Sequence, residues 1–166
     1  MSRVRSAYVE AVGAGVVSGM RSFLMPALLG RALSTDSGTP SVHGAADLLR
    51  SRTLSKALTI ASAGELVGDK LPAAPDRTEL PSLAARAVSG AFGATVFASW
   101  NREPAMPAAA LGMVGAIASA HLMMRLRRAA GRRLGVPDPV VALVEDVLAF
   151  AIGRTLISTV ERQADR

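Results

Sequence analysis

The amino-acid sequence predicts an all-α fold, a polytopic integral membrane bundle of about five helical spans in one domain of 166 residues. Three observations lead to this prediction. Hydrophobic residues make up 50% of the chain, charged residues only 19%, and the mean hydropathy is +0.33, which is too apolar for an ordinary water-soluble domain. Several apolar runs approach the roughly 20 residues with which a helix crosses a hydrocarbon core. Segments rich in proline, glycine and polar residues separate these runs.

Five runs are predicted to form the spans, and in chain order they are residues 11–30, 54–71, 83–100, 104–124 and 139–160. The clearest is the fourth, which carries no formal charge and is followed directly by five arginines. The second run is interrupted by four charged residues and would insert poorly alone. We therefore expect the second run to lie inside the bundle or to enter the membrane only partway.

The distribution of basic residues predicts the orientation and the partners. The arginine cluster between Arg125 and Arg133 favours the cytoplasmic side for the loop after the fourth span. With five spans, the N-terminus would share that side and the C-terminus would lie outside, so we expect a multi-pass protein of the inner (cytoplasmic) membrane. The net charge of +6 is accompanied by only 4% aromatic residues, which favours anionic lipid headgroups over nucleic acid as partners.

Ionised residues inside the apolar runs are the candidates for function, because a charge at the centre of a membrane helix costs roughly 2.5–3.5 kcal/mol. Arg21 lies in the middle of the first run and needs a carboxylate partner. Glu65 and Asp69 are four residues apart, which places both on one face of a helix. Glu145 and Asp146 lie inside the fifth run, where helix capping cannot explain them. Among the candidates, we rank Glu145 and Asp146 first.

A buried polar centre follows if these helices pack together. Arg86, near the start of the third run, would be its second arginine, although snorkelling to lipid headgroups is the default explanation for an arginine near the end of a span. A pairing of Arg21 with a carboxylate has a structural explanation as well, because buried ion pairs can fix geometry without adding stability.

Pairs of glycines four residues apart predict where helices approach each other closely. Two such pairs occur, Gly15 with Gly19 and Gly64 with Gly68. They favour helix association without identifying the neighbour, and we expect a homo-oligomer.

A short internal similarity suggests an inverted repeat. Residues 12–14 (VGA) recur as residues 114–116, and Glu65 in the second run has a counterpart in Glu145 in the fifth. Because one extra span separates the two halves, they would have opposite topology, an arrangement common in transporters.

Four segments resemble a family of uncharacterised bacterial membrane proteins called domain of unknown function 4126. They are residues 19–23 (GMRSF), residues 64–72 (GELVGDKLP) with Arg77, residues 137–138 (PD) and residues 144–146 (VED). The resemblance covers most of the chain. It implies a membrane protein and supports the choice of charged positions, to which its best-matching segment adds Lys70, but it implies no particular activity.

The candidate substrate-binding or ion-binding residues are therefore Arg21, Glu65, Asp69, Lys70, Arg86, Glu145 and Asp146. A transporter or channel for a small ion or solute is the first hypothesis. The alternatives are a membrane-embedded, Mg²⁺-dependent lipid-phosphate enzyme, whose carboxylates would hold the metal and whose arginines the phosphate, and a structural partner subunit. The chain has no cysteine, two histidines and no complete catalytic or P-loop motif, which argues against an enzyme, and we predict no cofactor.

Overall fold

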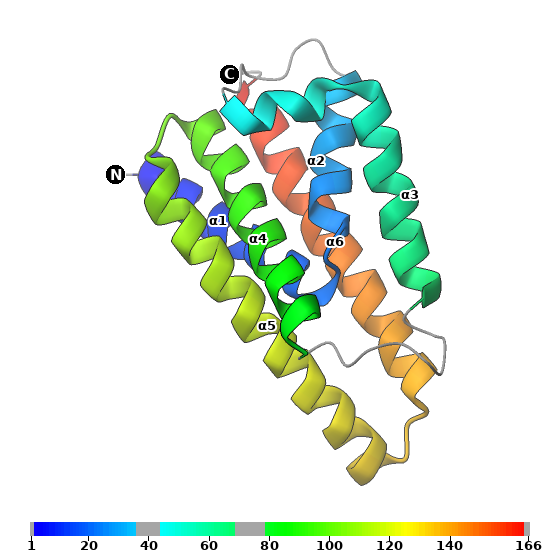
Figure 1. Cartoon of the computed structure of the whole chain (residues 1–166). Coiled ribbons are helices and arrows are strands. Elements are labelled where there is room, and N and C mark those ends of the chain that lie inside the picture. The colour runs from blue at the N-terminus through cyan, green and yellow to red at the C-terminus, as the bar shows by residue number, and fades with distance from the viewer. Residues whose placement is uncertain (1, 36–43, 69–78, 165–166) are drawn as a thin grey trace.

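The computed structural model describes residues 2–35, 44–68 and 79–164 of the chain. These residues form six α-helices and one short 3-10 helix, with no β-strand among them, so the all-α prediction is confirmed. The elements are α1 (Ser2–Met20), α2 (Leu24–Thr35), η1 (Gly44–Arg50), α3 (Arg52–Gly68), α4 (Leu80–Asn101), α5 (Ala105–Leu134) and α6 (Asp138–Ala164). They form an elongated bundle, in which α5 and α6 extend farthest at one end (Figure 1).

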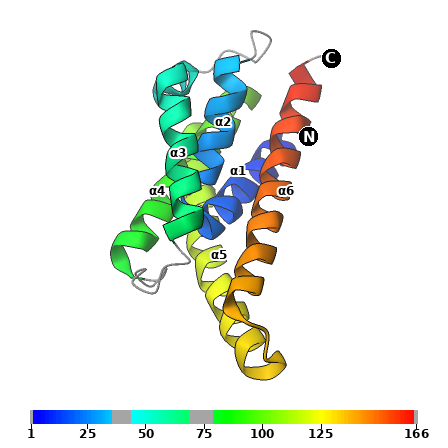
Figure 2. The same cartoon turned by 90° about the vertical axis from the view of Figure 1, so that its right-hand side faces the viewer.

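The prediction of one continuous helix over residues 11–30 is wrong. Helix α1 ends at Met20 and α2 begins at Leu24. Arg21, Ser22 and Phe23 form the turn between them, and we call these three residues the hairpin tip. Helix α2 runs back from the tip, so α1 and α2 form a V whose two open ends point toward the same end of the bundle (Figures 1 and 2).

This V changes the predicted topology. Helices α3, α4, α5 and α6 alternate in direction, whereas α1 and α2 together return to the side from which they start (Figure 1). Both termini consequently lie toward one end of the bundle, and the connection between α5 and α6 lies at the other (Figures 1 and 2). The five-span arrangement, which places the termini at opposite ends, does not agree with this architecture.

The other four predicted runs each correspond to one helix. Residues 54–71 overlap α3, 83–100 lie within α4, and 139–160 lie within α6. The predicted run 104–124 is shorter than α5, because the helix continues through the arginine cluster to Leu134. Helix α5 stops there because Gly135 adopts a positive φ of 63°, a left-handed conformation that favours glycine.

Helices α1, α4 and α5 form the tightest part of the bundle because glycines line their contact. A Cβ atom placed on Gly90 of α4 would lie 2.6 Å from the carbonyl oxygen of Gly112 on α5 and 3.2 Å from the Cα of Gly15 on α1. A Cβ on Gly19 would likewise meet the backbone of α5. The prediction that Gly15 and Gly19 permit close helix approach is confirmed.

Gly64 and Gly68 have no such neighbour among the residues that the structure describes. Outside α3 itself, a Cβ atom on either glycine would meet no atom of residues 2–35, 44–68 and 79–164 within 4 Å. Helix α3 packs mainly against α2 and η1, and much of its remaining surface is exposed. The glycine spacing alone could not show that the described helices leave these two glycines uncovered.

The surface and the interior show an unusual distribution of polarity. Large apolar side chains are exposed along α5 and α6, whereas charged side chains are buried between the helices. The buried charged residues are Glu10, Arg21, Arg86, Glu145 and Asp146. Among the described helices, α5 alone is both long enough and apolar enough to cross a membrane, judged by length and composition.

Candidate functional site

The hairpin tip leaves backbone groups outside the hydrogen-bonding pattern of either helix. The Arg21 N–H still donates to the Val17 carbonyl (2.8 Å), and the Leu24 N–H donates to the Arg21 carbonyl (3.3 Å). Pro26 has no N–H, so it cannot donate to the carbonyl of Ser22 four residues earlier, as a continuing helix would require. Inside a packed bundle, such free backbone groups need partners from elsewhere in the chain.

Glu65 of α3 supplies the acceptors for the free N–H groups at the start of α2. The Ser22 N–H donates to Oε1 (2.8 Å) and the Phe23 N–H donates to Oε2 (3.0 Å). The N-terminus of a helix carries partial positive charge, which makes it a favourable position for a carboxylate. The side chain of Glu65 is only 10% exposed, so these hydrogen bonds are largely shielded from solvent.

Arg86 of α4 supplies the donors for the free carbonyls at the end of α1. Its Nη1 donates to the carbonyl oxygens of Gly19 (3.0 Å) and Met20 (2.8 Å). Its Nη2 lies 3.5 Å from Glu65 Oε1 and links the two sides of the break. The side chain of Arg86 is 2% exposed, so the snorkelling alternative for this residue is wrong.

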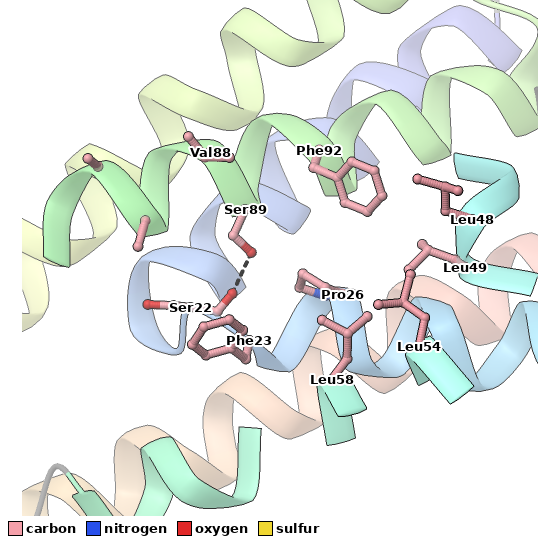
Figure 3. A pocket seen from close by; sticks show the side chains of 12 residues that line it. Ser22, Phe23, Pro26, Leu48, Leu49, Leu54, Leu58, Val88, Ser89 and Phe92 are labelled. Atoms are coloured by element: carbon pink, nitrogen blue, oxygen red, sulfur yellow. Dashed lines mark hydrogen bonds between the residues drawn. The ribbon is translucent and has the colours of Figure 1, made fainter. Parts of the chain in front are cut away.

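Ser89, one turn along α4 from Arg86, satisfies the carbonyl that Pro26 leaves free. Its hydroxyl donates to the Ser22 carbonyl oxygen, as Figure 3 shows, and lies 3.4 Å from the hydroxyl of Ser18. A proline on α2 is thus complemented by a serine on α4, and the break in the helix is held by side chains from two other helices.

Arg21 extends from the tip toward α6 and pairs with Asp146. Its Nε and Nη2 both lie 2.5 Å from the same carboxylate oxygen, Oδ1. The exposed fractions are 2% for the Arg21 side chain and 10% for that of Asp146. Arg21 therefore has the carboxylate partner that the sequence predicts, and this partner lies on α6. We call the hairpin tip together with Glu65, Arg86, Ser89 and Asp146 the tip cluster.

Glu145 belongs to a different group, although it is the neighbour of Asp146 in sequence. Its Oε2 lies 3.6 Å from Nε of Arg127 on α5, and that same nitrogen lies 3.4 Å from Asp138 at the start of α6. Consecutive residues point about 100° apart around a helix, so Glu145 faces α5 while Asp146 faces the tip. Asp146 therefore joins Arg21, and Glu145 lies with Arg127.

The structure brings together four of the seven predicted site residues. Arg21, Glu65, Arg86 and Asp146 meet in the tip cluster, and Glu145 lies in the second group. Asp69 and Lys70 lie outside the described residues. Sequence reasoning missed Ser89 and the backbone of the tip, and the signal for the tip was Pro26 inside an apolar run.

Two pockets flank α2 near the tip. The α3–α4 pocket, about 470 Å³ in volume, is almost entirely apolar, and its walls include Phe23, Pro26, Leu54, Leu58, Val88 and Phe92 (Figure 3). The α3–α6 pocket, about 360 Å³, has Arg21 and Asp146 in its wall. The tip residues thus contribute to both pockets, with Ser22 and Phe23 in the first and Arg21 in the second.

The chemistry of the cluster is that of paired ions and hydrogen bonds. Two guanidinium groups, Arg21 and Arg86, face two carboxylates, Glu65 and Asp146, so their formal charges cancel. In residues 2–35, 44–68 and 79–164, no three His, Cys, Asp or Glu side chains come together in a way that could hold a metal ion.

Comparisons with known proteins give a single family assignment. No curated protein and no solved structure matches the chain. The sequence pattern of one family, described as a domain of unknown function (DUF4126), matches residues 9–158, which is most of the chain and includes every residue of the tip cluster. The chain therefore belongs to the DUF4126 family.

Proposed function

We propose that this protein is a small multi-pass membrane transporter or channel in which the tip cluster forms the polar part of the pathway. The membrane part of this proposal is supported by the distribution of polarity. Large apolar side chains such as Val144, Val147 and Phe150 are more than half exposed on α6, while Arg21 and Arg86 are almost completely buried. Contiguous exposed apolar surface is rare on soluble monomers and suits contact with lipid tails.

The single observation that carries the transport proposal is the hairpin tip held by charged side chains between two pockets. Interrupted helices place backbone N–H and C=O groups inside a bundle, and transporters use such groups to bind ions and solutes. The tip borders both the α3–α4 and the α3–α6 pocket.

The position of the cluster also favours transport over lipid-phosphate chemistry. An enzyme acting on lipid phosphate needs its carboxylates and arginines at the depth of the headgroups. The tip lies between the two ends of the bundle, whereas the end of α5 that carries the arginine cluster extends well beyond it (Figures 1 and 2). Both arginines of the cluster are, in addition, already engaged by Asp146 or by backbone carbonyls.

Glu65 is the proposed moving part. Its carboxylate is the link that ties α3 to the tip, while α3 otherwise packs mainly on α2 and η1. Protonation of Glu65 would remove the charge that the two tip N–H groups and Arg86 stabilise. Helix α3 could then move away from the tip and join the two pockets into one path.

Proton flux into liposomes tests this proposal. The purified chain would be reconstituted with a trapped pH-sensitive dye, and a potassium diffusion potential would drive proton entry. We expect flux with the wild type and its loss in Glu65→Gln and in Asp146→Asn, because neither amide can take up and release a proton as the pathway requires. Glu79→Gln, at an exposed position before α4, is the matched control and should keep the wild-type rate. Equal flux in all four proteins, or none with folded wild type, would contradict a proton pathway through the cluster.

A further inference from the structure

Asp146 has an oxygen that its ion pair with Arg21 does not use. Both guanidinium nitrogens of Arg21 approach Oδ1, and Oδ2 is buried with no hydrogen-bond partner among the described residues. A carboxylate oxygen has lone pairs for about two hydrogen bonds, and leaving a buried acceptor unmatched is costly. The usual fork geometry, with one nitrogen on each oxygen, would have satisfied both. The arrangement leaves one acceptor for a donor from outside the protein.

The α3–α6 pocket lies beside this acceptor. Asp146, Arg21 and the buried Ser62 of α3 are its polar wall residues. The rest of the wall is apolar and includes Leu24, Leu66, Val147 and Phe150. A largely apolar pocket with a few polar groups at one place is typical of small-molecule sites.

The charges around the pocket select the kind of ligand. Arg21 and Asp146 cancel each other, so a charged ligand would bring an unbalanced charge into a buried site. An anion would be repelled by the spare oxygen, and a cation by the adjacent guanidinium group. A neutral molecule with one hydrogen-bond donor and an apolar body satisfies the acceptor without adding charge.

We infer that the α3–α6 pocket binds a neutral amphiphile whose hydroxyl, or another neutral donor group, bonds to Oδ2 of Asp146 while its apolar part lies against Leu66, Val147 and Phe150. This inference goes beyond the proposed transport activity and does not depend on it, because binding requires only the pocket and its spare acceptor. Such a ligand is either a lipid alcohol from the bilayer or a free solute of the same chemistry.

Photolabelling of the full chain in lipid nanodiscs tests the inference. The probe is a diazirine-bearing octanol, and mass spectrometry of the digested protein locates the label. We expect labelled peptides from α3 around Leu66 and from α6 around Phe150. Ala151→Phe, which fills the pocket from α6, should remove this labelling, whereas Ala85→Phe, which fills the α3–α4 pocket, should leave it unchanged.

Competition between two isomers then tests the role of Asp146. n-Hexanol carries a donor and dipropyl ether only an acceptor, and the two have the same composition. At equal concentration in the bilayer, hexanol should displace the probe from the α3–α6 pocket at least about tenfold more effectively, because the donor bonds to a charged acceptor. At the α3–α4 pocket the two should be equal, since the serine hydroxyls there can donate and accept.

Asp146→Asn should reverse the preference, because its amide can keep the oxygen toward Arg21 and present an N–H to the pocket. The ether then gains affinity. The isomer comparison on the wild type stands even if this variant does not fold. Equal displacement by both isomers at the α3–α6 pocket, or labelling that survives Ala151→Phe in a folded protein, would overturn the inference and leave only an apolar cavity. Displacement by diolein as well as by hexanol would identify the lipid source, and displacement by hexanol alone the free solute.

Discussion

Arg21 and Asp146 are 125 positions apart in the sequence, yet they form a buried ion pair in which both guanidinium nitrogens approach one carboxylate oxygen at 2.5 Å. This contact fixes the hairpin tip to the last helix. Its counterpart on the other side of the tip is the contact of Glu65 with two backbone N–H groups. The tip is thus held from α3, α4 and α6 at once, and each of these attachments can be tested separately.

The ion pair predicts strong coupling between Arg21 and Asp146. Arg21→Met alone leaves a buried carboxylate without its cation and should cost about 3–5 kcal/mol of folding free energy. Asp146→Asn alone should cost a similar amount, while the double variant should recover a large part of the loss. Denaturant unfolding in detergent, analysed as a double-mutant cycle, measures the coupling. The pair Arg21→Met with Glu145→Gln is the matched control and should be additive, because Glu145 faces Arg127.

The carboxylate of Glu65 should protect the backbone of the tip. Glu65→Gln keeps the shape but exchanges one of two acceptor oxygens for a donor, so one of the Ser22 and Phe23 N–H groups loses its partner. A buried unsatisfied group costs about 1–3 kcal/mol. Hydrogen exchange followed by mass spectrometry should show faster exchange at the tip in this variant. Unchanged protection there, with Glu79→Gln as the reference, would show that the carboxylate does not hold the tip.

Replacing glycine by alanine should lower the folding stability in the contact between α4 and α5 and raise it on the exposed face of α3. Gly90→Ala places a Cβ 2.6 Å from the Gly112 carbonyl oxygen, so α4 and α5 must separate, and overpacking of this kind typically costs about 1–3 kcal/mol. Gly64→Ala meets open space within an exposed helix and should stabilise by about 0.5–1 kcal/mol. Melting temperatures of the two variants in one detergent compare them directly. Destabilisation by Gly64→Ala would mean that Gly64 has a neighbour beyond the described residues.

The V of α1 and α2 predicts that both termini lie on one side of the membrane. Reporters fused to the N-terminus and to the C-terminus should lie on the same side of the membrane. A reporter inserted at Gly131 should lie on the opposite side. The five-span arrangement instead predicts that the termini differ. Opposite readings for the two termini would show that α1 and α2 cross the membrane as one unit. The orientation itself then follows from the compartment of Gly131, which we expect to be cytoplasmic because of the arginine cluster.

Most helices and about half of the site could be predicted from the sequence, and physical reasons explain both what was predicted and what was not. Apolar runs bounded by breakers gave α3, α4, α5 and α6, because run length and turn residues are local properties. The break after Met20 does not follow from Arg21, because a charge within an apolar run indicates a need for a partner and not an end of the helix. Pro26 carried the relevant information, since a proline removes the N–H that the carbonyl four residues earlier requires.

The remaining errors concern tertiary contacts. Whether Glu145 or Asp146 meets Arg21 depends on the rotation of α6 about its axis, and a difference of about 100° cannot be read from a run of apolar residues. The role of Arg86 was not predictable either, because its partners are the carbonyls of Gly19 and Met20, which become free only when the break exists. Homo-oligomerisation, binding of anionic lipids and the inverted repeat stay predictions.

The distance in sequence between Arg21 and Asp146 has a consequence for biosynthesis. The hairpin is made first, but Asp146, which forms an ion pair with its arginine, is made nearly last, after α3, α4 and α5. In a membrane, the arginine at the hairpin tip is buried less favourably before Asp146 is present. The first two helices would therefore wait at the lipid headgroups while the later ones insert, and would enter the bundle only when α6 is complete. A ribosome-stalled chain that ends before α6 should then expose its first helices to protease, although they are the oldest part of the molecule.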